Sequence, residues 1–328
     1  MNACERKYKR IGDSMQISFQ AFGTYNQIMA EVDCLPLLEE CRSLCEAIEA
    51  KFSAFQPTSA IAEISAQAGI RPVAIDEETF FMLKRAQDFS NLSKGAFDIT
   101  IRPATALWGI GKKGDFVPDA GDLEQLQELV NYKGLVLDQK NGTAMLQKAG
   151  QQIDLGGIAK GYAADKARDH LVQNGCSSAL INFGGNIATI GEKLNGESWQ
   201  VGVQNPLAKR GEFIGTVSLT NQTMVTSGVN ERFFIRDGKR YHHILDPRTC
   251  RPADSSLLSV TVVGNRSIDM DALSTALLVL GPDEGAKLTN QTGCHALFIL
   301  TNREIFATDG FTKMLKRKVS YHGSENKK

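Results

Sequence analysis

Residues 153–175 read IDLGGIAKGYAADKARDHLVQNG, and the pattern changes twice within this short segment. It predicts a strand, then a glycine-rich turn, then a helix that ends at Gly175. The three glycines let the backbone approach a ligand closely. The N-terminus of the helix favours an anion, and Lys160 adds a positive charge. Such a turn suits a pyrophosphate, although its spacing is neither the Walker A nor the Rossmann pattern. A strand-to-helix turn without a ligand is the alternative interpretation.

Helical and strand patterns follow one another irregularly on both sides of this segment. Helices are expected over about 35–52, from 77 to before 95, from 120 or 123 to near 134, and over about 269–280 with a short helix after it. Strands are expected over 16–30, in hairpins at 135–148 and 232–244, among short strands from 178 to 263, and near 296–308. Without regular βαβ alternation, this order predicts an α+β fold rather than a doubly wound sheet.

The composition limits the classes of partner. The chain has 37 basic and 37 acidic residues among 328, so its charge gives no reason to expect nucleic acid or an anionic membrane as the main partner. The longest apolar stretch, 273–281, is too short to span a bilayer, and no hydrophobic leader follows the N-terminus. We therefore expect no direct membrane insertion and a cytoplasmic location, unless a leader has been removed. The seven scattered cysteines favour reduced thiols.

Asp271 and Thr275 lie four residues apart on the expected helix at 269–280. At that spacing both side chains fall on one helix face, a single turn apart. A carboxylate and a hydroxyl suit a hard cation such as Mg²⁺, which completes its shell with waters and substrate phosphates. The alternative is structural: an acidic residue near a helix start, and a threonine that bonds back to a carbonyl.

Two further segments carry groups that suit chemistry. His242 and His243 end a predicted strand, where adjacent side chains point to opposite faces, so only one of them can line a given site. A histidine there suits a general base or a phosphate contact, while a solvated pair is the alternative. The segment GAFDIT, residues 95–100, follows a helix stop and offers an aromatic ring and a carboxylate to a heteroaromatic ligand. A helix cap followed by a strand explains the same letters.

In their order along the chain, these segments resemble the FAD:protein FMN transferase (ApbE) family. The matching stretches are FGTYNQI (22–28), FSAFQPTSAI (52–61), GAFDITIRPATALWGIG (95–111), IDLGGIAKGYAAD (153–165), LINFGGNI (180–187), TSGVNERFF (226–234), YHHILDPRTCRP (241–252) and DMDALSTALLVLG (269–281). The resemblance implies an ApbE-like, T-fold-like α+β fold with mixed or antiparallel sheets, packed helices and an FAD cleft. It implies one flavin transferase domain over 16–312, between a polar N-terminal segment (1–15) and a polar C-terminal tail (313–328).

The resemblance also assigns site residues by position. It implies that Mg²⁺ is bound by Asp271, Thr275 and the backbone carbonyl of Gly157. The residues implied to bind FAD are Phe22, Phe55, Ala96, Phe97, Asp98, Asp154, Lys160, His243 and the backbone near Ile244. His243 matches the family histidine that helps to activate the acceptor hydroxyl, so His243 and Asp271 are the expected catalytic residues. Four positions depart from the family pattern: Phe22, Phe55, Met270 and Cys250. Cys250 replaces a turn glycine and Met270 a small residue.

The implied reaction transfers FMN from FAD to a threonine or serine of another protein, and AMP leaves. The implied partner is an acceptor flavoprotein of a reductase or electron-transport system. Two alternatives remain open at the level of sequence. The same Mg²⁺ site with water as acceptor would be an FAD pyrophosphatase, and a protein without catalysis would be an FAD binder.

Overall fold

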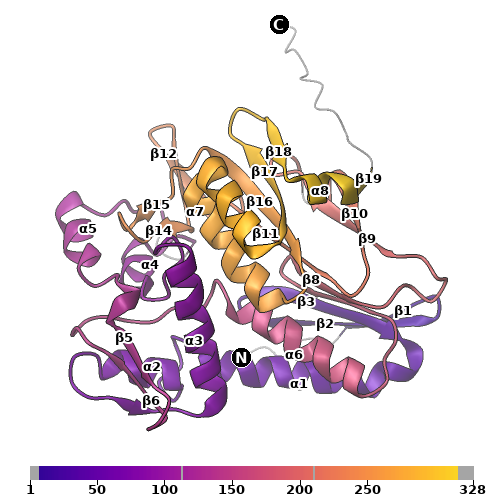
Figure 1. Cartoon of the computed structure of the whole chain (residues 1–328), viewed down its shortest axis with the longest axis horizontal. Coiled ribbons are helices and arrows are strands. Elements are labelled where there is room, and N and C mark those ends of the chain that lie inside the picture. The colour runs from indigo at the N-terminus through magenta and orange to yellow at the C-terminus, as the bar shows by residue number, and fades with distance from the viewer. Residues whose placement is uncertain (1–6, 112–113, 210, 317–328) are drawn as a thin grey trace, which may run out of the picture.

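The computed structural model describes residues 7–111, 114–209 and 211–316, and its main feature is a nine-stranded antiparallel sheet (Figure 1). In spatial order the strands are β1 (Lys7–Ile11), β2 (Ser14–Ala21), β3 (Thr24–Glu31), β7 (Ala179–Phe183), β8 (Asn186–Ile190), β11 (Thr223–Gly228), β16 (Leu257–Gly264), β17 (His295–Leu300) and β18 (Ile305–Ala307). Buried residues alternate along β7, as expected of a strand with one face on the core.

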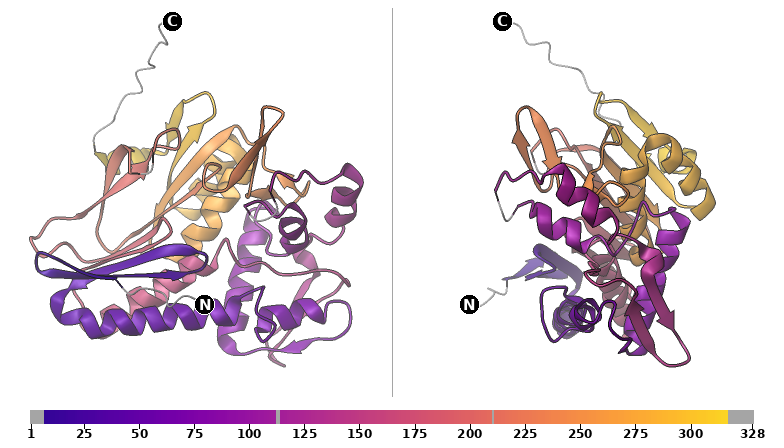
Figure 2. Two further views of the ribbon diagram at one scale, coloured as in Figure 1. Left: turned by 180° about the vertical axis from the view of Figure 1, so that it is seen from behind. Right: turned by 90° about the vertical axis from the view of Figure 1, so that its left-hand side faces the viewer.

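Three helices, α1, α6 and α7, pack on one face of this sheet, and the other helices lie beside it (Figure 1). The helices are α1 (Leu35–Phe52), α2 (Ala60–Ala66), α3 (Glu77–Leu92), α4 (Arg102–Trp108), α5 (Ala120–Gln127), α6 (Ala159–Gln173), α7 (Ser267–Thr292) and α8 (Asp309–Met314), with 3₁₀ turns η1 (Val32–Cys34) and η2 (Tyr132–Gly134). Helices α1 and α6 lie side by side along the sheet, and α7 packs on α6, β11 and β16 (Figures 1 and 2). None of the helices among the described residues is long and apolar enough to cross a membrane.

Smaller sheets surround the main one. They are β4 (Val73–Ala74) with β6 (Thr143–Leu146) and β5 (Leu135–Asp138); β19 (Leu315–Lys316) with β10 (Phe213–Leu219) and β9 (Trp199–Gln204); the hairpin β12 (Phe233–Arg236) and β13 (Lys239–His242); and β14 (Leu245–Asp246) with β15 (Arg251–Pro252). The predicted α+β class is confirmed, as are the two predicted hairpins. The predicted helix at 35–52 is also confirmed, with Leu38, Cys41, Cys45, Ile48 and Phe52 buried along one face.

Several expected boundaries differ from the structure. The strand expected at the start of 153–175 is absent from the described residues there: Gln152 makes an isolated bridge to Ile101, and irregular backbone follows until α6. Residues 16–30 form two strands joined by a tight turn, in which Phe22 and Gly23 have φ of 55° and 64°. Helix α5 ends at Gln127 rather than near 134.

The described ends of the chain belong to ordered elements. Strand β1 begins at Lys7, inside the segment expected to be a polar extension, and pairs with β2 at the edge of the main sheet. At the other end, residues 313–316 lie in α8 and β19, and β19 pairs with β10. The rest of the expected tail, 317–328, and residues 1–6 lie outside the described part of the chain. The expected domain limits of 16 and 312 therefore divide elements that the structure joins.

Helices α6 and α7 touch through their backbones. A Cβ atom on Gly161 would lie 2.3 Å from the carbonyl oxygen of Ser267, so only glycine fits there. One turn further along α6, the fully buried Asp165 accepts hydrogen bonds from the backbone N–H groups of Ser267 and Ile268, each at 2.9 Å. These donors are the first in α7 and have no partner within their own helix. A side chain of α6 therefore caps α7, and we call this contact the α6–α7 clamp.

Removing the capping carboxylate should destabilise the protein strongly. Asp165→Ala leaves two buried N–H groups without an acceptor, so we expect its free energy of unfolding in urea to fall by about 3 kcal/mol. Asp169→Ala is the matched control. Arg266 pairs with Asp165 at 3.3 Å and with the half-exposed Asp169 at 3.0 Å. An exposed ion pair contributes only about 0.5 kcal/mol to stability. Equal losses in the two variants would contradict the cap.

Candidate FAD and magnesium site

The centre of the candidate site is the carboxylate of Asp271, in the second turn of α7. It is only 4% exposed, and its Oδ2 accepts a hydrogen bond from the N–H of Gly161 at 2.9 Å. The Lys160 ammonium lies 3.3 Å and 3.4 Å from the two carboxylate oxygens, and it also donates to the carbonyl of Gly156 at 2.9 Å. Lys160 therefore connects the glycine-rich turn to α7, and the α6–α7 clamp holds both ends of this connection.

Thr275 lies one helical turn beyond Asp271 on the same face. Its hydroxyl donates to the carbonyl of Asp271 at 3.4 Å, which is the bond expected if Thr275 has only a structural role. The same oxygen also lies close to the glycine-rich turn. A Cβ on Gly157 would lie 3.5 Å from Thr275 Oγ1 and 3.1 Å from the ring of Phe97. The structure thus brings the three expected Mg²⁺ ligands, Asp271, Thr275 and Gly157, into one cluster.

The chemistry of this cluster fits the expected ion. A carboxylate, a hydroxyl and a backbone carbonyl are hard oxygen donors, and Mg²⁺ prefers few protein ligands together with waters and phosphate oxygens. The positive charge of Lys160 lies beside the buried Asp271 carboxylate and offsets part of the cost of burying its negative charge. The three groups come from the turn before α6 and from α7, so the clamp sets their separation.

The segment 95–101 forms the wall beside Gly157. Ala96 and Phe97 are buried, and the Phe97 ring lies against Gly157. Asp98 is also buried, and its carboxylate accepts hydrogen bonds from Thr100 N–H, Thr100 O–H and Tyr132 N–H at 2.7 to 2.8 Å. Burial raises the pKa of Asp98, and these hydrogen bonds oppose the shift. These hydrogen bonds join the loop of Asp98 to η2. The expected contact of Asp98 with FAD stays a prediction.

Asp154 shapes the glycine-rich turn from the other side. Its Oδ1 accepts from the N–H of Gly156 at 2.9 Å, and its Oδ2 accepts from the hydroxyl of Thr105 at 3.3 Å. The first bond is the local side-chain turn that aspartate commonly forms. Asp154 therefore ties the turn to α4, and its own carboxylate stays half-exposed beside the turn.

His243 follows β13 directly and its partner is the backbone of Arg232. The His243 N–H donates to the carbonyl of Arg232 at 3.0 Å, and Nδ1 lies 3.3 Å from the same oxygen. The pKa of His243 is lowered from 6.5 to about 4, chiefly by burial and also by the charges of Arg232 and Lys160, while the hydrogen bond to the Arg232 carbonyl opposes the shift. The ring is therefore neutral near pH 7. With the proton on Nδ1 facing the carbonyl, Nε2 keeps a lone pair.

His242 is the other member of the pair and has a different environment. It is 5% exposed, and its Nε2 bonds to the carbonyl of Ala253 at 3.0 Å. The two histidines thus have separate backbone partners, and of the two only the pKa of His243 is lowered by the charge of Lys160.

The remaining expected FAD residues lie at varied depth. Phe22 sits in the turn between β2 and β3, and its N–H donates to Glu49 at 2.6 Å. Phe55 is 61% exposed, with the guanidinium of Arg102 4.2 Å above its ring. Ile244 is buried, and its carbonyl accepts from Ala253 N–H at 3.0 Å. Their contact with FAD stays a prediction.

Two departures from the family pattern have clear structural consequences. Cys250 has a φ of 54°, so the backbone keeps the left-handed turn that the family glycine would favour. The carbonyl of Cys250 accepts from the Trp108 indole N–H at 2.7 Å, which secures this turn against α4. Met270 lies against β16, with its sulfur 2.6 Å from where a Cβ on Gly264 would be.

Two surface hollows of about 440 and 620 Å³ flank α3, and none of the expected FAD residues lines either. The site is therefore defined here by the convergence of side chains around Asp271.

Sequence reasoning missed two residues that position the site. Asp165 lies within the quoted glycine-rich segment, and a carboxylate on the buried face of a helix was the available signal. Arg232 holds His243 with its carbonyl, while its side chain donates to the carbonyl of Gly23 at 3.3 Å. Its partners are about 11 and 209 positions away. The second of these separations gives no local signal at all.

The lowered pKa of His243 has a measurable consequence. The folded state prefers the neutral ring, so this group contributes stability above pH 6.5, and the contribution is lost as the pH falls through about 4. We expect NMR titration of the His243 ring to give a midpoint near 4. His243→Gln identifies the resonance, because it removes the signal of that ring alone. A midpoint near 6.5 would contradict the described environment.

Comparisons with known proteins identify the family of the chain. The sequence profile of the ApbE family matches residues 14–298. The chain is 40% identical over 248 residues to an FAD:protein FMN transferase of Klebsiella pneumoniae, covering 75% of this chain and 77% of the relative. It is 36% identical over 293 residues to one of Treponema pallidum, covering 85% and 81%.

Solved structures share the whole fold. The ApbE protein of Thermotoga maritima superposes with a TM-score of 0.85 at 32% identity, covering 95% of this chain and 100% of that one. The flavin transferase ApbE of Vibrio cholerae gives 0.83 at 25% identity, covering 95% and 100%. With the ordered motifs, the fold and the cluster around Asp271 all in agreement, the chain belongs to the ApbE family.

Proposed function

We propose that this protein transfers FMN from FAD to a threonine or serine hydroxyl of an acceptor flavoprotein and releases AMP. The observation that carries the proposal is the convergence of Asp271, Thr275, Gly157 and Lys160 at the junction of α6 and α7. Relatives with up to 40% identity are named for this reaction. The acceptor belongs to a reductase or electron-transport system, and the cytoplasmic location stays a prediction.

The chain's own residues have distinct parts in the proposed reaction. Asp271, Thr275 and the carbonyl of Gly157 hold Mg²⁺, which supplies positive charge against the pyrophosphate of FAD. Lys160 adds a second positive charge at the same place, so the group that leaves as AMP is stabilised electrostatically. The rigid α6–α7 clamp keeps these groups in position before the substrate binds, which reduces the reorganisation that the reaction requires.

His243 is the proposed general base. Because its Nδ1 faces the carbonyl of Arg232, Nε2 is available to take the proton of the acceptor hydroxyl. The hydroxyl oxygen then bonds to the FMN-side phosphorus, and the bond from that phosphorus to the bridging oxygen of AMP breaks. The proton ends on His243, the FMN ends on the acceptor, and AMP carries away the bridging oxygen.

The test combines the purified protein with FAD, Mg²⁺ and a fragment of a candidate acceptor flavoprotein that carries the threonine. Mass spectrometry should detect addition of FMN to the threonine, with AMP formed in equal amount, and EDTA should abolish both. AMP without covalent flavin would instead identify an FAD pyrophosphatase. FAD binding without either product, across a panel of acceptor fragments, would identify an FAD binder.

The role of Asp271 is tested by a change of charge with little change of shape. Asp271→Asn should lower the rate of FMN transfer by at least about 100-fold, because the cluster loses its only carboxylate ligand. Asp269→Asn is the matched control, since Asp269 lies two residues away on α7 and pairs with Arg85 at 2.7 Å. Calorimetry should show weaker Mg²⁺ binding only in the first variant. A near-normal Asp271→Asn enzyme would contradict the metal assignment.

A further inference from the structure

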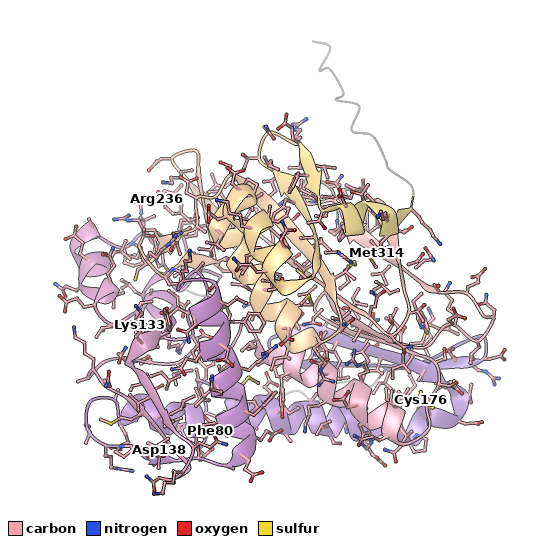
Figure 3. The ribbon with its side chains drawn as sticks, viewed as in Figure 1. Phe80, Lys133, Asp138, Cys176, Arg236 and Met314 are labelled. Atoms are coloured by element: carbon pink, nitrogen blue, oxygen red, sulfur yellow. The ribbon has the colours of Figure 1, made fainter. Side chains whose placement is uncertain are left out.

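A second group of side chains with ligand chemistry lies at the other end of α6. Glu31 ends β3, Cys34 ends η1 and begins the turn into α1, and Cys176 follows α6 just before β7. One ligand atom from each of these residues lies within 4.8 Å of the other two. Figure 3 places Cys176 across the molecule from Lys133 and Arg236. Helix α6 has 15 residues, so the group lies about 22 Å from the glycine-rich turn.

The carboxylate of Glu31 is held in a fixed orientation. Its Oε1 accepts hydrogen bonds from the N–H of Ser177 at 2.8 Å, the hydroxyl of Ser177 at 2.7 Å and the N–H of Ser178 at 2.8 Å. Among the described residues, its Oε2 has no recorded hydrogen bond or ion pair. One oxygen is thus fully engaged by the loop after α6, and the other is left for a ligand.

The two thiols are adjacent and nearly inaccessible to water. Cys34 is 7% and Cys176 4% exposed, their sulfur atoms lie within 4.8 Å of each other, and the Cys176 thiol donates to the carbonyl of Ser178 at 3.6 Å. The pKa of both thiols is raised, that of Cys176 to about 12, chiefly by burial and in part by the negative charge of Glu31. The two thiols are therefore uncharged and lie beside a carboxylate. Of the three side chains only that of Glu31 is charged, and its charge is negative.

We propose that Glu31, Cys34 and Cys176 form a binding site for one divalent cation of the zinc class, with water as the fourth ligand. Tetrahedral zinc, with bonds of about 2.3 Å to sulfur and about 2.0 Å to oxygen, separates its ligand atoms by roughly 3.5 to 3.8 Å. The three atoms already lie within 4.8 Å of one another, so no pair has to approach by more than about 1.3 Å to reach that spacing. On binding, both thiols give up their protons to solvent, and the cation's charge is offset by two thiolates and one carboxylate.

The charges around the thiols favour a cation over a disulfide. Disulfide exchange requires a thiolate, and a neighbouring carboxylate opposes its formation. A divalent cation reverses this effect, since it is attracted by the same carboxylate and lowers the pKa of any thiol that it binds. The bound cation would join β3, the start of α1 and the start of β7, three segments that are separated in sequence by up to about 145 positions.

The experiment measures Zn²⁺ binding to the full-length reduced protein by calorimetry, in excess Mg²⁺ so that the cluster around Asp271 is saturated. We expect one Zn²⁺ per chain, a Kd below about 1 μM, and release of roughly two protons per ion at neutral pH in buffers of different ionisation enthalpy. Cobalt(II) should give the absorption of a tetrahedral thiolate site. FMN transfer should be unchanged in every variant below, which separates this proposal from the proposed function.

Variants identify the ligands. Cys34→Ser and Cys176→Ser should each weaken Zn²⁺ binding at least about 100-fold. Cys294→Ser, which changes another buried free thiol, is the control and should bind normally. Glu31→Gln keeps a hydrogen-bond acceptor for the loop and removes the charge, so weaker binding with unchanged thermal stability of the metal-free protein isolates the ligand role. Absence of Zn²⁺ binding, or equal binding by wild type and the Cys34→Ser Cys176→Ser double variant, overturns the proposal.

Discussion

The contact between the backbones of α6 and α7 is the constraint on which the site depends. Gly161 leaves no room for a side chain against Ser267, and Asp165 supplies the acceptors that the first turn of α7 lacks. Two helices joined in this way cannot slide without leaving buried donors unpaired, which is costly. Lys160 directly precedes Gly161 on α6, and Asp271 lies one turn beyond Ser267 on α7, so the clamp sets the distance between their side chains.

The buried carboxylates Asp98, Asp165 and Asp271 fall into two kinds according to their hydrogen-bond partners. Asp98 and Asp165 are enclosed by backbone donors, and their oxygens are occupied by the fold itself. The Asp271 carboxylate receives a single backbone N–H and a lysine, and the Thr275 hydroxyl one turn away lies beside Gly157. A carboxylate that is buried yet only partly satisfied by its own fold is suited to a cation and a phosphate. The number of hydrogen-bond donors that the fold supplies to each carboxylate thus distinguishes the structural aspartates from the one proposed to act in the reaction.

Local patterns in the sequence predicted most of the elements but not their limits. Helix α1 was recognisable because apolar residues recur at its spacing, and the β12–β13 hairpin because Asp237-Gly238 favours a tight turn. The strand expected before Gly156 is absent, because an alternating pattern of three or four residues is also satisfied by an irregular segment packed on the core. The β1 strand was missed because it is polar and lies at the edge of the sheet.

The site was predictable to the extent that its residues share short motifs. Asp271 and Thr275 follow from helical spacing, whereas their meeting with Gly157 follows from tertiary packing that no local pattern records. The tautomer of His243 depends on a carbonyl of Arg232, a backbone group that sequence letters do not describe. The turn at Cys250 has the same origin: a tryptophan from α4 fixes a left-handed residue that sequence alone would assign to glycine.

The order in which the chain is synthesised gives the clamp a further consequence. All the residues of the glycine-rich turn leave the ribosome more than 100 residues before Ser267, the first residue of α7, and strand β16, which joins β11 to β17 in the main sheet, ends only at Gly264. Until then Gly161 has neither its backbone neighbour nor the carboxylate that accepts its N–H. A chain that ends before Ser267 therefore has the glycine-rich turn without the helix that faces it.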